Sequence, residues 1–399
     1  MMWERVKLAD VSDSCLGKML DQRKNKGIYK PYLANVNVRW GAFDLDNLQE
    51  MKFEDDEDER YGIKYGDLII CEGGEPGRCA IWKEQLPNMK IQKALHRLRV
   101  NEEMDYRYVY YWFLLAGKQG ALKQYYTGAT IMHMPGQKLK EVVIDKPPLD
   151  VQRKIGDYLE AFDDLIENNQ KQIKLLEEAA QRLYKEWFVD LRFPGYEDVD
   201  VVDGVPEGWT YKRVEEFGEV ITGKTPSTSK TEYYGGSIPF VTIPDMHGNV
   251  FPLVTEKTLT KVGADTQKNK YLPANTVIVS CIATVGLVNI AIEPCQTNQQ
   301  INSVILHDDN NLYFFYESMK RIKTLLDGVG SNGATMTNVN KTKFSNIKVL
   351  YPTEDLVMKY NEFCKPIFAQ ILASSKAMLT SKQARDRLLP KLMSGEIEV

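Results

Sequence analysis

Residues 149–187 read LDVQRKIGDYLEAFDDLIENNQKQIKLLEEAAQRLYKEW, and this stretch decides the fold. Its apolar residues recur at alternating steps of four and three, which is the heptad pattern of a helix that packs against another helix. No Gly or Pro lies between Gly156 and Pro194, so residues 155–187 can form one helix about 50 Å long. The predicted seam, with one polar interruption, includes Ile155, Leu159, Phe162, Ile166, Asn169, Ile173 and Leu176.

A second stretch, residues 355–394, carries a similar stripe that includes Ile367, Ile371, Leu388 and Leu392. Pro366 removes a backbone donor from this stripe, so we expect a kink or a fresh helix start there. Two long apolar seams in one chain are satisfied if the helices pack on each other as an antiparallel pair. The alternative is that each helix packs only on its own domain.

The regions before the two helices repeat each other. Gly128-Ala129-Thr130 recurs as Gly333-Ala334-Thr335, and Pro147 recurs as Pro352, both 205 residues later. Leu8, Val11, Gly17 and Lys18 match Val214, Phe217, Gly223 and Lys224; Leu68-Ile69-Ile70 matches Val277-Ile278-Val279, and Gln92 matches Gln299. An ordered series of this kind indicates an internal duplication.

Each copy opens with short β-branched runs broken by Gly, Pro and Asn, which predict strands joined by turns. A helix-like stretch follows in each (106–124 and 311–326), and then come the Gly-Ala-Thr loop and a last strand. The predicted fold class is α+β, with two pseudo-repeated α/β domains joined by two long antiparallel helices that act as a coiled-coil spacer. The predicted boundaries are 1–148 (first domain), 149–192 (central helix), 193–208 (linker), 209–352 (second domain) and 353–399 (C-terminal helix).

Composition is that of an ordinary globular chain, with 43% hydrophobic and 27% charged residues. The net charge of −4 becomes +2 without the acidic run at residues 54–59, which we expect to be a solvated loop kept away from any polyanion. The six cysteines form no CxxC pair and the four histidines lack zinc-ligand spacing, so we expect buried, reduced thiols and no metal. No membrane span or secretory leader is evident, which favours the cytoplasm.

Two motifs resemble enzyme signatures and are interpreted as structural. Residues 218–225, GEVITGKT, satisfy the phosphate-loop pattern, but no buried strand precedes them and no helix follows. Only their Gly-Lys pair recurs in the first copy, so a scaffold role is favoured over nucleotide hydrolysis. Asp145-Lys146-Pro147-Pro148 departs from the methyltransferase motif, and its prolines are expected to end a strand and start the long helix.

Polar loops at equivalent places in the two copies are the candidates for DNA contact. They offer cations for phosphates, amides that pair with adenine edges, and hydroxyls and aromatic rings. The Thr of each Gly-Ala-Thr loop is a candidate for a phosphate contact. The full set is Lys24, Lys30, Arg39, Arg78, Lys93, Arg97 and Thr130 in the first copy, and Lys224, Thr228, Lys230, Tyr233, Asn298, Gln299 and Thr335 in the second. No catalytic or metal-binding residue is expected.

Several stretches resemble the specificity subunits of type I restriction-modification systems, and the similarity covers almost the whole chain. The most specific are Pro147 to Ile155, Phe162 to Asn169, and Arg387 to Ile397, with Gly66 to Ile70 and Tyr32 to Val36 resembling the family's target-recognition domains. The second copy departs from the family's pattern, because residues 355–358 (DLVM) stand where the first copy has DVQR at 150–153.

The resemblance implies a non-catalytic subunit in which each domain reads one half of a bipartite site on double-stranded DNA. The helices would set the gap between the half-sites and dock two modification subunits, and a separate restriction subunit, a motor-nuclease, would cut DNA. S-adenosylmethionine, ATP and Mg would belong to those partners and not to this chain. Two other classes stay open at this point: an enzyme that hydrolyses nucleotides or methylates alone, and a scaffold without sequence preference.

Overall fold

The computed structural model describes residues 3–21, 25–327 and 338–399, and for Leu326 and Asp327 the backbone only. The chain divides into two compact units. Unit 1 comprises Met1–Leu165 and Thr380–Val399, and unit 2 comprises Ile166–Leu379. Each unit therefore combines one copy of the repeat with part of each of the two long helices. No helix among the described residues is long and apolar enough to cross a membrane.

Unit 1 is built on a four-stranded antiparallel sheet. Its strand order is β2 (Ser12–Leu16), β10 (Leu95–Val100), β7 (Leu68–Cys71) and β8 (Cys79–Ile81). A second sheet has the order β6 (Gln49–Phe53), β3 (Ile28–Leu33) and β9 (Lys90–Ile91), with β3 and β9 parallel. The remaining elements are the pairs β1 (Glu4–Lys7) with β11 (Val143–Lys146) and β4 (Val38–Arg39) with β5 (Ala42–Phe43), and the helices α1 (Leu8–Val11), α2 (Asp58–Tyr61), α3 (Tyr106–Gln119) and α4 (Gly136–Lys140).

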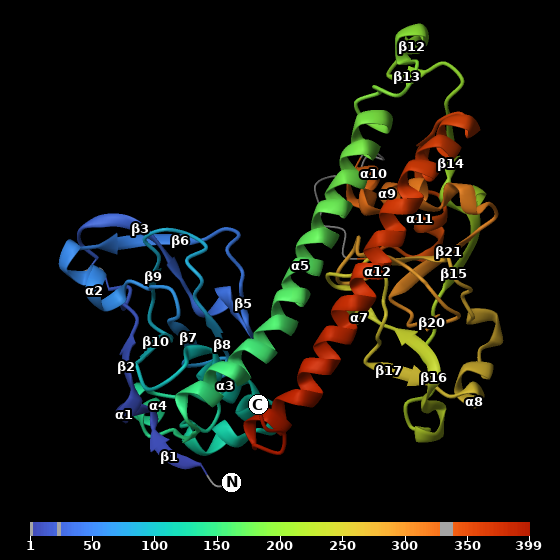
Figure 1. Cartoon of the computed structure of the whole chain (residues 1–399). Helices are drawn as coiled ribbons and strands as arrows, with labels where there is room; N and C mark the ends of the chain where they lie inside the picture. The colour runs from blue at the N-terminus through green and yellow to red at the C-terminus, as the bar shows by residue number, and fades with distance from the viewer. Residues whose placement is uncertain (1–2, 22–24, 328–337) are drawn as a thin grey trace. The chain divides into compact units, whose positions relative to one another are not determined.

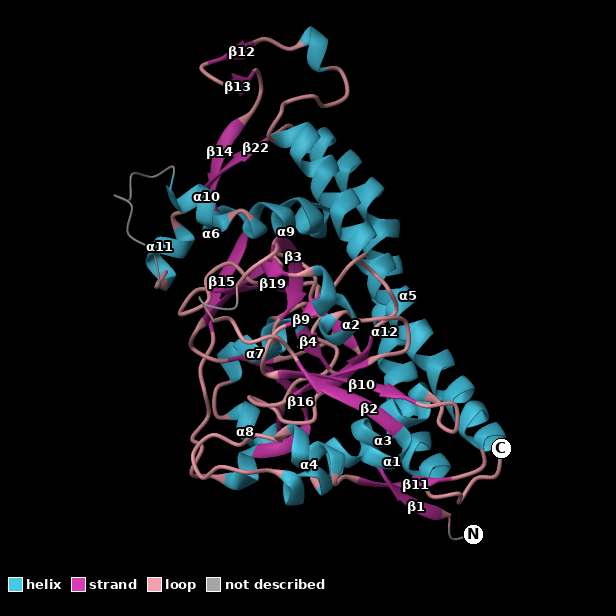
Figure 2. Cartoon of the chain, turned by 90° about the vertical axis from the view of Figure 1, so that its left-hand side faces the viewer, coloured by secondary structure: helices cyan, strands magenta, loops and turns pink. Residues whose placement is uncertain are grey.

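Unit 2 repeats the strand orders of the two sheets and the pairing of the first and last strands, which confirms the predicted duplication. Its sheets have the orders β15 (Gly218–Thr222), β21 (Ile301–Leu306), β18 (Val277–Ser280), β19 (Val288–Ile290), and β17 (Lys257–Leu259), β16 (Tyr234–Val241), β20 (Gln296–Thr297). Strand β14 (Thr210–Arg213) pairs with β22 (Lys348–Tyr351), as Figure 2 shows. The helices are α6 (Val214–Phe217), α7 (Ile243–Met246), α8 (Lys261–Asp265), α9 (Leu312–Lys320), α10 (Ile322–Asp327) and α11 (Lys341–Ser345), and the linker forms the hairpin β12 (Val201–Val202) and β13 (Val205–Pro206).

One predicted equivalence is wrong by a single residue. The amide of Gln92 donates to Leu33, and the amide of Asn298 donates to the corresponding Val241. Gln92 therefore corresponds to Asn298 and not to Gln299, and Lys93 corresponds to Gln299. The shared identity of Gln92 and Gln299 does not make them equivalent, because the register is set by the backbone hydrogen bonds of β9 and β20 and not by the side chains of the turn.

The predicted antiparallel helix pair is present (Figure 1). Helices α5 (Leu149–Phe188) and α12 (Glu354–Met393) each contain 40 residues. In unit 2, the Tyr360 hydroxyl donates to the Ala180 carbonyl over 3.1 Å and the Ser374 hydroxyl donates to Gln172 over 3.0 Å. Residue numbers rise along one helix as they fall along the other, so the helices are antiparallel.

The expectation of a fresh helix start at Pro366 is wrong, because α12 runs through this residue as one helix. A proline inside a helix leaves the carbonyl four residues earlier without its backbone partner. Here that residue is Glu362, which is exposed, so water can satisfy its carbonyl. Cys364 and Phe368 on either side are buried and hold this part of the helix against unit 2.

The core of each unit joins its sheet to both long helices through one helix of the repeat. In unit 1, Tyr108 and Phe113 of α3 lie in one buried cluster with Leu159 of α5 and Leu392 of α12. In unit 2, the equivalent cluster contains residues from α9, α5 and α12, including Phe314, Tyr184, Trp187, Tyr360 and Phe368. The helices are therefore integral to both cores, and the alternative in which each helix packs only on its own domain is wrong.

Candidate nucleic-acid interface

Three loops of unit 1 meet at one end of its four-stranded sheet. They are the turn 92–94 before β10, the loop 72–78 between β7 and β8, and the hairpin 127–133. The Glu72 amide donates to the Ala94 carbonyl over 2.9 Å, and the Met134 amide donates to the Glu72 carbonyl over 2.7 Å. Antiparallel pairing of the strands brings these loops together, since β7 ends where β10 begins. We call this surface the sheet end of unit 1.

Four of the predicted DNA-contacting residues gather at this sheet end. Lys93 and Thr130 are exposed on two of its loops. Arg78 donates to the Asn35 carbonyl over 3.2 Å and also contacts Glu75 at 3.2 Å. Arg39, on the neighbouring β4, donates to the Val36 carbonyl and lies 3.7 Å from Asp44. Among the described residues Lys93 has no acidic partner, whereas both arginines have one.

The acidic run at residues 54–59 is exposed to solvent except at Glu57, as expected, but it is not a loop. It forms a 3-10 turn at Asp55–Glu57 followed by α2, and two of its carboxylates bind lysines. Asp58 lies 2.9 Å from the Lys30 ammonium and 3.0 Å from the Lys90 ammonium, and Glu57 pairs with Lys18. Lys18 and Lys90 are buried and need opposite charges. Lys30 therefore pairs with the acidic run that we expected to be kept away from a polyanion.

Arg97 is a structural residue and not a surface cation, which corrects the expectation that it faces DNA. It is 4% exposed, and its guanidinium lies 2.5 Å from the Asp13 carboxylate. It also donates to the carbonyls of Glu59 and Arg60 over 3.0 and 3.2 Å, which fixes the end of the acidic run against β10. Lys24 lies outside the described residues.

The sheet end of unit 2 is built in the same way. The Lys224 amide donates to the Thr297 carbonyl over 2.9 Å, and the Thr225 hydroxyl donates to the Gln299 side chain over 2.6 Å. The Cys281 amide donates to the Gln300 carbonyl over 2.9 Å. The two polar loops that the sequence singled out in this copy are therefore in contact, and they bring Lys224, Asn298 and Gln299 together. Lys224 and Gln299 are exposed.

Other predicted residues of unit 2 lie farther along the loop from β15 to β16. Thr228 and Lys230 are exposed, and the Lys230 ammonium lies 5.2 Å from the centre of the Tyr233 ring. The Tyr234 hydroxyl donates to the Pro226 carbonyl over 2.7 Å, which closes this loop on itself. Thr335 and the rest of its Gly-Ala-Thr loop lie outside the described residues.

The Gly-Lys pair is a scaffold feature. A Cβ on Gly17 would lie 2.4 Å from the Gln92 carbonyl oxygen, and one on Gly223 would lie 2.2 Å from that of Asn298. Both glycines thus permit the same close approach of two backbones. Residues 218–222 form strand β15 and no helix follows Thr225, so the match to the phosphate-loop pattern lacks the required structure.

Sequence reasoning missed a pair of buried amides that position the Lys224 loop. The Gln267 side chain donates to the Lys224 carbonyl and to the Gln296 side chain, each over 2.7 Å. Gln296 in turn donates to the Ala264 carbonyl over 3.0 Å. Both glutamines are buried. Nothing in the sequence distinguishes them from surface glutamines, because their partners are backbone groups distant along the chain.

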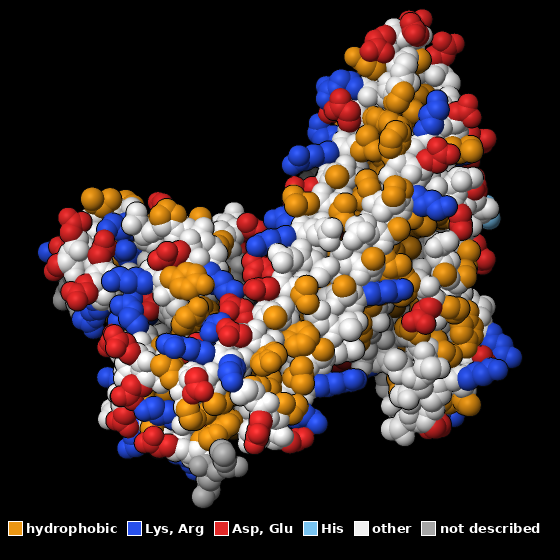
Figure 3. Space-filling view, in the orientation of Figure 1, with side chains coloured by type: hydrophobic (Ala, Val, Ile, Leu, Met, Phe, Trp, Pro, Cys, Tyr) orange, Lys and Arg blue, Asp and Glu red, His pale blue; other side chains and the backbone are white. Residues whose placement is uncertain are grey.

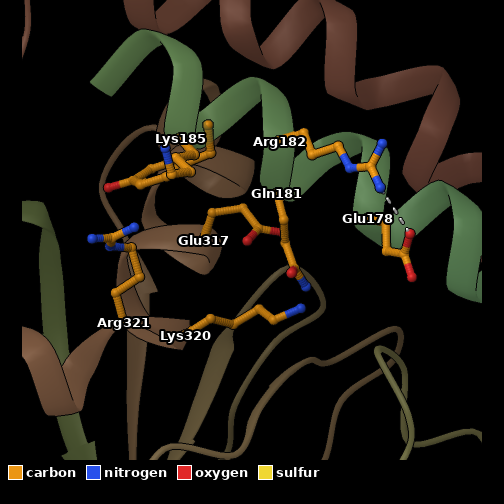
Figure 4. Close-up of a pocket in the computed structure, with 8 residues that line it drawn as sticks. Glu178, Gln181, Arg182, Lys185, Glu317, Lys320 and Arg321 are labelled. Carbon is orange, nitrogen blue, oxygen red and sulfur yellow. Dashed lines mark hydrogen bonds and ion pairs between the residues drawn. The ribbon is translucent and has the colours of Figure 1, made fainter. Parts of the chain in front are cut away.

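A separate pocket of about 360 Å³ lies in unit 2, where α5 meets α9 (Figure 4). Arg182 and Lys185 of α5 and Lys320 and Arg321 surround it. Glu317 is buried in its wall with one carboxylate oxygen unpartnered, and burial raises its pKa to about 7. No sequence pattern predicts this pocket, and none of the residues of the sheet end lines it.

The described surface shows no large patch of one charge on the face drawn in Figure 3, where basic and acidic side chains are interspersed over unit 1. Among the described residues, no group of three or more His, Cys, Asp or Glu side chains could hold a metal ion. Five of the six cysteines are buried, as expected, and burial raises the pKa of Cys281 to about 11. What recurs in both units is the sheet end with its exposed polar turn.

Comparison with known proteins identifies the family. The family model of the type I restriction modification DNA specificity domain matches residues 2–178 and 206–355. The HindI specificity subunit of Haemophilus influenzae is 35% identical over 314 residues, which cover 63% of this chain and 68% of that protein. The MjaIX specificity subunit of Methanocaldococcus jannaschii is 29% identical over 346 residues, covering 84% and 78%.

The fold is also that of a solved relative. The crystal structure of the type I S subunit from M. genitalium aligns over 98% of this chain and 96% of that one, with a TM-score of 0.59 and 15% sequence identity. The duplicated topology, the paired helices and the family match agree. The chain therefore belongs to the family of type I restriction-modification DNA specificity subunits.

Proposed function

We propose that each unit reads one half of a bipartite DNA site through its sheet end, and that the two sheet ends read different bases. The observation that carries this proposal is the equivalence of Lys93 and Gln299, which are both exposed at the same position of the same turn. A lysine at this position suits the O6 and N7 acceptors of guanine, whereas a glutamine suits the N6 and N7 pattern of adenine. A common scaffold with different side chains is what reading two different half-sites requires.

The remaining parts of the complex belong to partner subunits in this proposal. Two modification subunits would dock on α5 and α12 and methylate adenine with S-adenosylmethionine, and a restriction subunit would use ATP and Mg. The predicted seam residues of α5 and α12, among them Ile155, Leu159, Ile371 and Leu392, are used in the cores of the two units. Docking would therefore use the outward-facing side chains of the two helices.

The test is to sequence the host genome for N6-methyladenine with this gene present, deleted, and replaced by variants. Deletion should abolish methylation at one bipartite motif with a fixed gap. Lys93→Ala should relax one half of that motif and Gln299→Ala the other half. Lys7→Ala is the matched control, because Lys7 is an exposed lysine at the end of β1, away from the sheet end. This variant should leave both halves of the motif intact.

Two results would contradict the proposal. If deletion leaves methylation unchanged in a cell that expresses the modification subunit, the chain does not supply its specificity. If Lys93→Ala and Gln299→Ala relax the same half, the two sheet ends do not read separate half-sites.

A further inference from the structure

The hairpin 127–133 of unit 1 presents two apolar side chains to solvent. Thr127 and His133 exchange backbone hydrogen bonds of 2.8 and 2.9 Å, which close the hairpin. Gly128 has a φ of +100°, and a Cβ there would lie 2.3 Å from the Ile131 carbonyl oxygen, so the turn requires glycine. At its tip, Ile131 is 65% exposed and Met132 is 47% exposed. The hairpin is thus a closed structure that holds apolar side chains outward.

A buried histidine attaches this hairpin to the sheet. His96, on β10, is 1% exposed, and its Nε2 lies 3.1 Å from the carbonyl oxygen of Met134, just after the hairpin. A carbonyl oxygen can only accept a hydrogen bond, so Nε2 is the donor and carries the proton. Burial lowers the pKa of His96, which keeps the ring neutral. The Met134 amide is also engaged, because it donates to Glu72.

Unit 2 contains the same attachment with a different residue. Asn302 stands on β21 where His96 stands on β10, since both pair with the last residue of the neighbouring strand, Thr222 and Leu16 respectively. The Asn302 side chain donates to the Val339 carbonyl over 3.2 Å, and the Val339 amide donates to Cys281. Two chemically different side chains thus make the same bond at the same place, which indicates that the position of the following backbone is what matters.

The location of the hairpin tip indicates which kind of molecule contacts Ile131 and Met132. The hairpin belongs to the same sheet end as Lys93 and Arg78, because Glu72 binds both the 92–94 turn and Met134. Two side chains on a narrow tip form a small apolar surface, whereas a docked protein usually covers a broad one. Ile and Met are among the apolar side chains that DNA-binding proteins insert between base steps. The exposed ammonium of Lys93 at the same sheet end fits a polyanion.

We propose that Ile131 and Met132 make apolar contact with bases of the half-site read by unit 1, and that His96 is a positioning residue for their hairpin. This inference rests on the proposed function. It adds an apolar contact to the polar contacts of the sheet end, and it names the residue that preorganises the contact.

The test uses the chain assembled with the modification subunit of its own system and a duplex that carries the methylated motif. The double variant Ile131→Ser, Met132→Ser should bind this duplex about tenfold more weakly. Its salt dependence should match that of the unaltered complex, because no phosphate contact is lost. Val202→Ser, which alters a residue 68% exposed on β12 of the linker, is the control and should bind normally.

The positioning role of His96 is tested by the DNA affinity of two further variants. His96→Asn introduces the residue that unit 2 uses at this position and should retain full affinity, whereas His96→Leu should lose about as much affinity as the tip variant. If the Asn and Leu variants weaken binding equally while both remain folded, His96 does not act through the bond to Met134.

The outcomes separate the two proposals. If the unaltered complex binds the motif no better than a random duplex, the proposed function fails. If it discriminates but the tip variant binds like the unaltered complex, only the apolar contact fails. A tip variant that no longer assembles with the modification subunit, yet leaves DNA binding by assembled complexes unchanged, would assign the tip to that protein partner and overturn the inference.

Discussion

At the scale of single residues, the two lysines of the Gly-Lys pair have different environments although their sequence contexts match. Lys18 is buried, pairs with Glu57 and lies 5.0 Å from the centre of the Phe53 ring, whereas Lys224 is exposed. The glycines before them have the same role in both units, since each lies against the backbone of β9 or β20 and the turn that follows. The glycine therefore serves the fold in both units, whereas the lysine is a buried structural residue in unit 1 and an exposed residue in unit 2.

Gly223→Ala should destabilise unit 2 because its Cβ would lie 2.2 Å from the Asn298 carbonyl oxygen and 2.4 Å from that of Thr297. Overpacking of this kind costs about 1–3 kcal/mol. Lys224→Ala should leave stability within about 0.5 kcal/mol and weaken DNA binding. Hydrogen exchange of the β15 and β21 amides measures the stability of both variants, and titration with the methylated duplex measures DNA binding. Equal protection in the Gly223→Ala variant and the unaltered protein would contradict the scaffold role.

Glu317 makes the free energy of unfolding of unit 2 depend on pH. Burial raises its pKa from the ordinary 4.5 to about 7. Between these values the folded chain binds more protons than the unfolded chain, so this group lowers the free energy of unfolding as pH rises from about 4.5 to 7. Glu317→Gln should remove this loss. The free energy of unfolding of the variant should equal that of the unaltered protein near pH 4 and exceed it by roughly 3 kcal/mol above pH 7. Urea unfolding at several pH values tests this, and a difference independent of pH would refute it.

At the scale of elements, the helix pair carries an ion pair in one unit and an aromatic side chain at the equivalent position in the other. In unit 1, Asp163 of α5 accepts hydrogen bonds from Arg385 of α12 and from the Tyr111 hydroxyl of α3, the latter over 2.7 Å. In unit 2, the position equivalent to Asp163 is occupied by Phe368, whose ring stacks on Tyr313 with centroids 4.3 Å apart. The two packings of the pseudo-repeat are therefore not interchangeable, which fixes the register of α5 against α12.

Arg385→Ala should destabilise unit 1 by about 3–5 kcal/mol, because it leaves Asp163 with a largely buried, unpaired charge. The double variant Asp163→Leu, Arg385→Met should be much closer to the unaltered protein, since both charges are removed. Lys171→Ala, which breaks an exposed pair with Glu167, is the control and should change stability by less than about 0.5 kcal/mol. Hydrogen exchange in α3 reports the result, and equal losses in the single and double variants would rule out this account.

At the scale of the whole molecule, α5 and α12 each run without a break from one unit into the other. In the proposed function these helices set the gap between the half-sites. Insertion of one heptad in both, between Leu165 and Ile166 and between Leu379 and Thr380, adds about 10 Å of helix, which is about three base pairs. The methylated motif should keep both half-sites and gain a gap longer by about that amount. An unchanged gap in an active complex would show that the helices do not set it.

The sequence by itself determined the architecture. The apolar seam of residues 149–187, its counterpart near the C-terminus and the repeat anchored at Gly128 and Gly333 predicted two α/β units and an antiparallel helix pair. These features are local or periodic, so they can be read without knowing which distant residues meet. The family resemblance followed from the same stretches.

Only the tertiary structure decided which polar residues are available for contact. Arg97 is buried on Asp13, 84 positions away along the chain, and Lys30 is paired with Asp58, whereas Lys93 and Lys224 remain exposed. The one-residue shift between Gln92 and Gln299 and the buried attachment at His96 were equally hidden. The physical reason is that ion pairing, burial and backbone register depend on contacts between strands distant in sequence, and residue type alone does not encode these contacts.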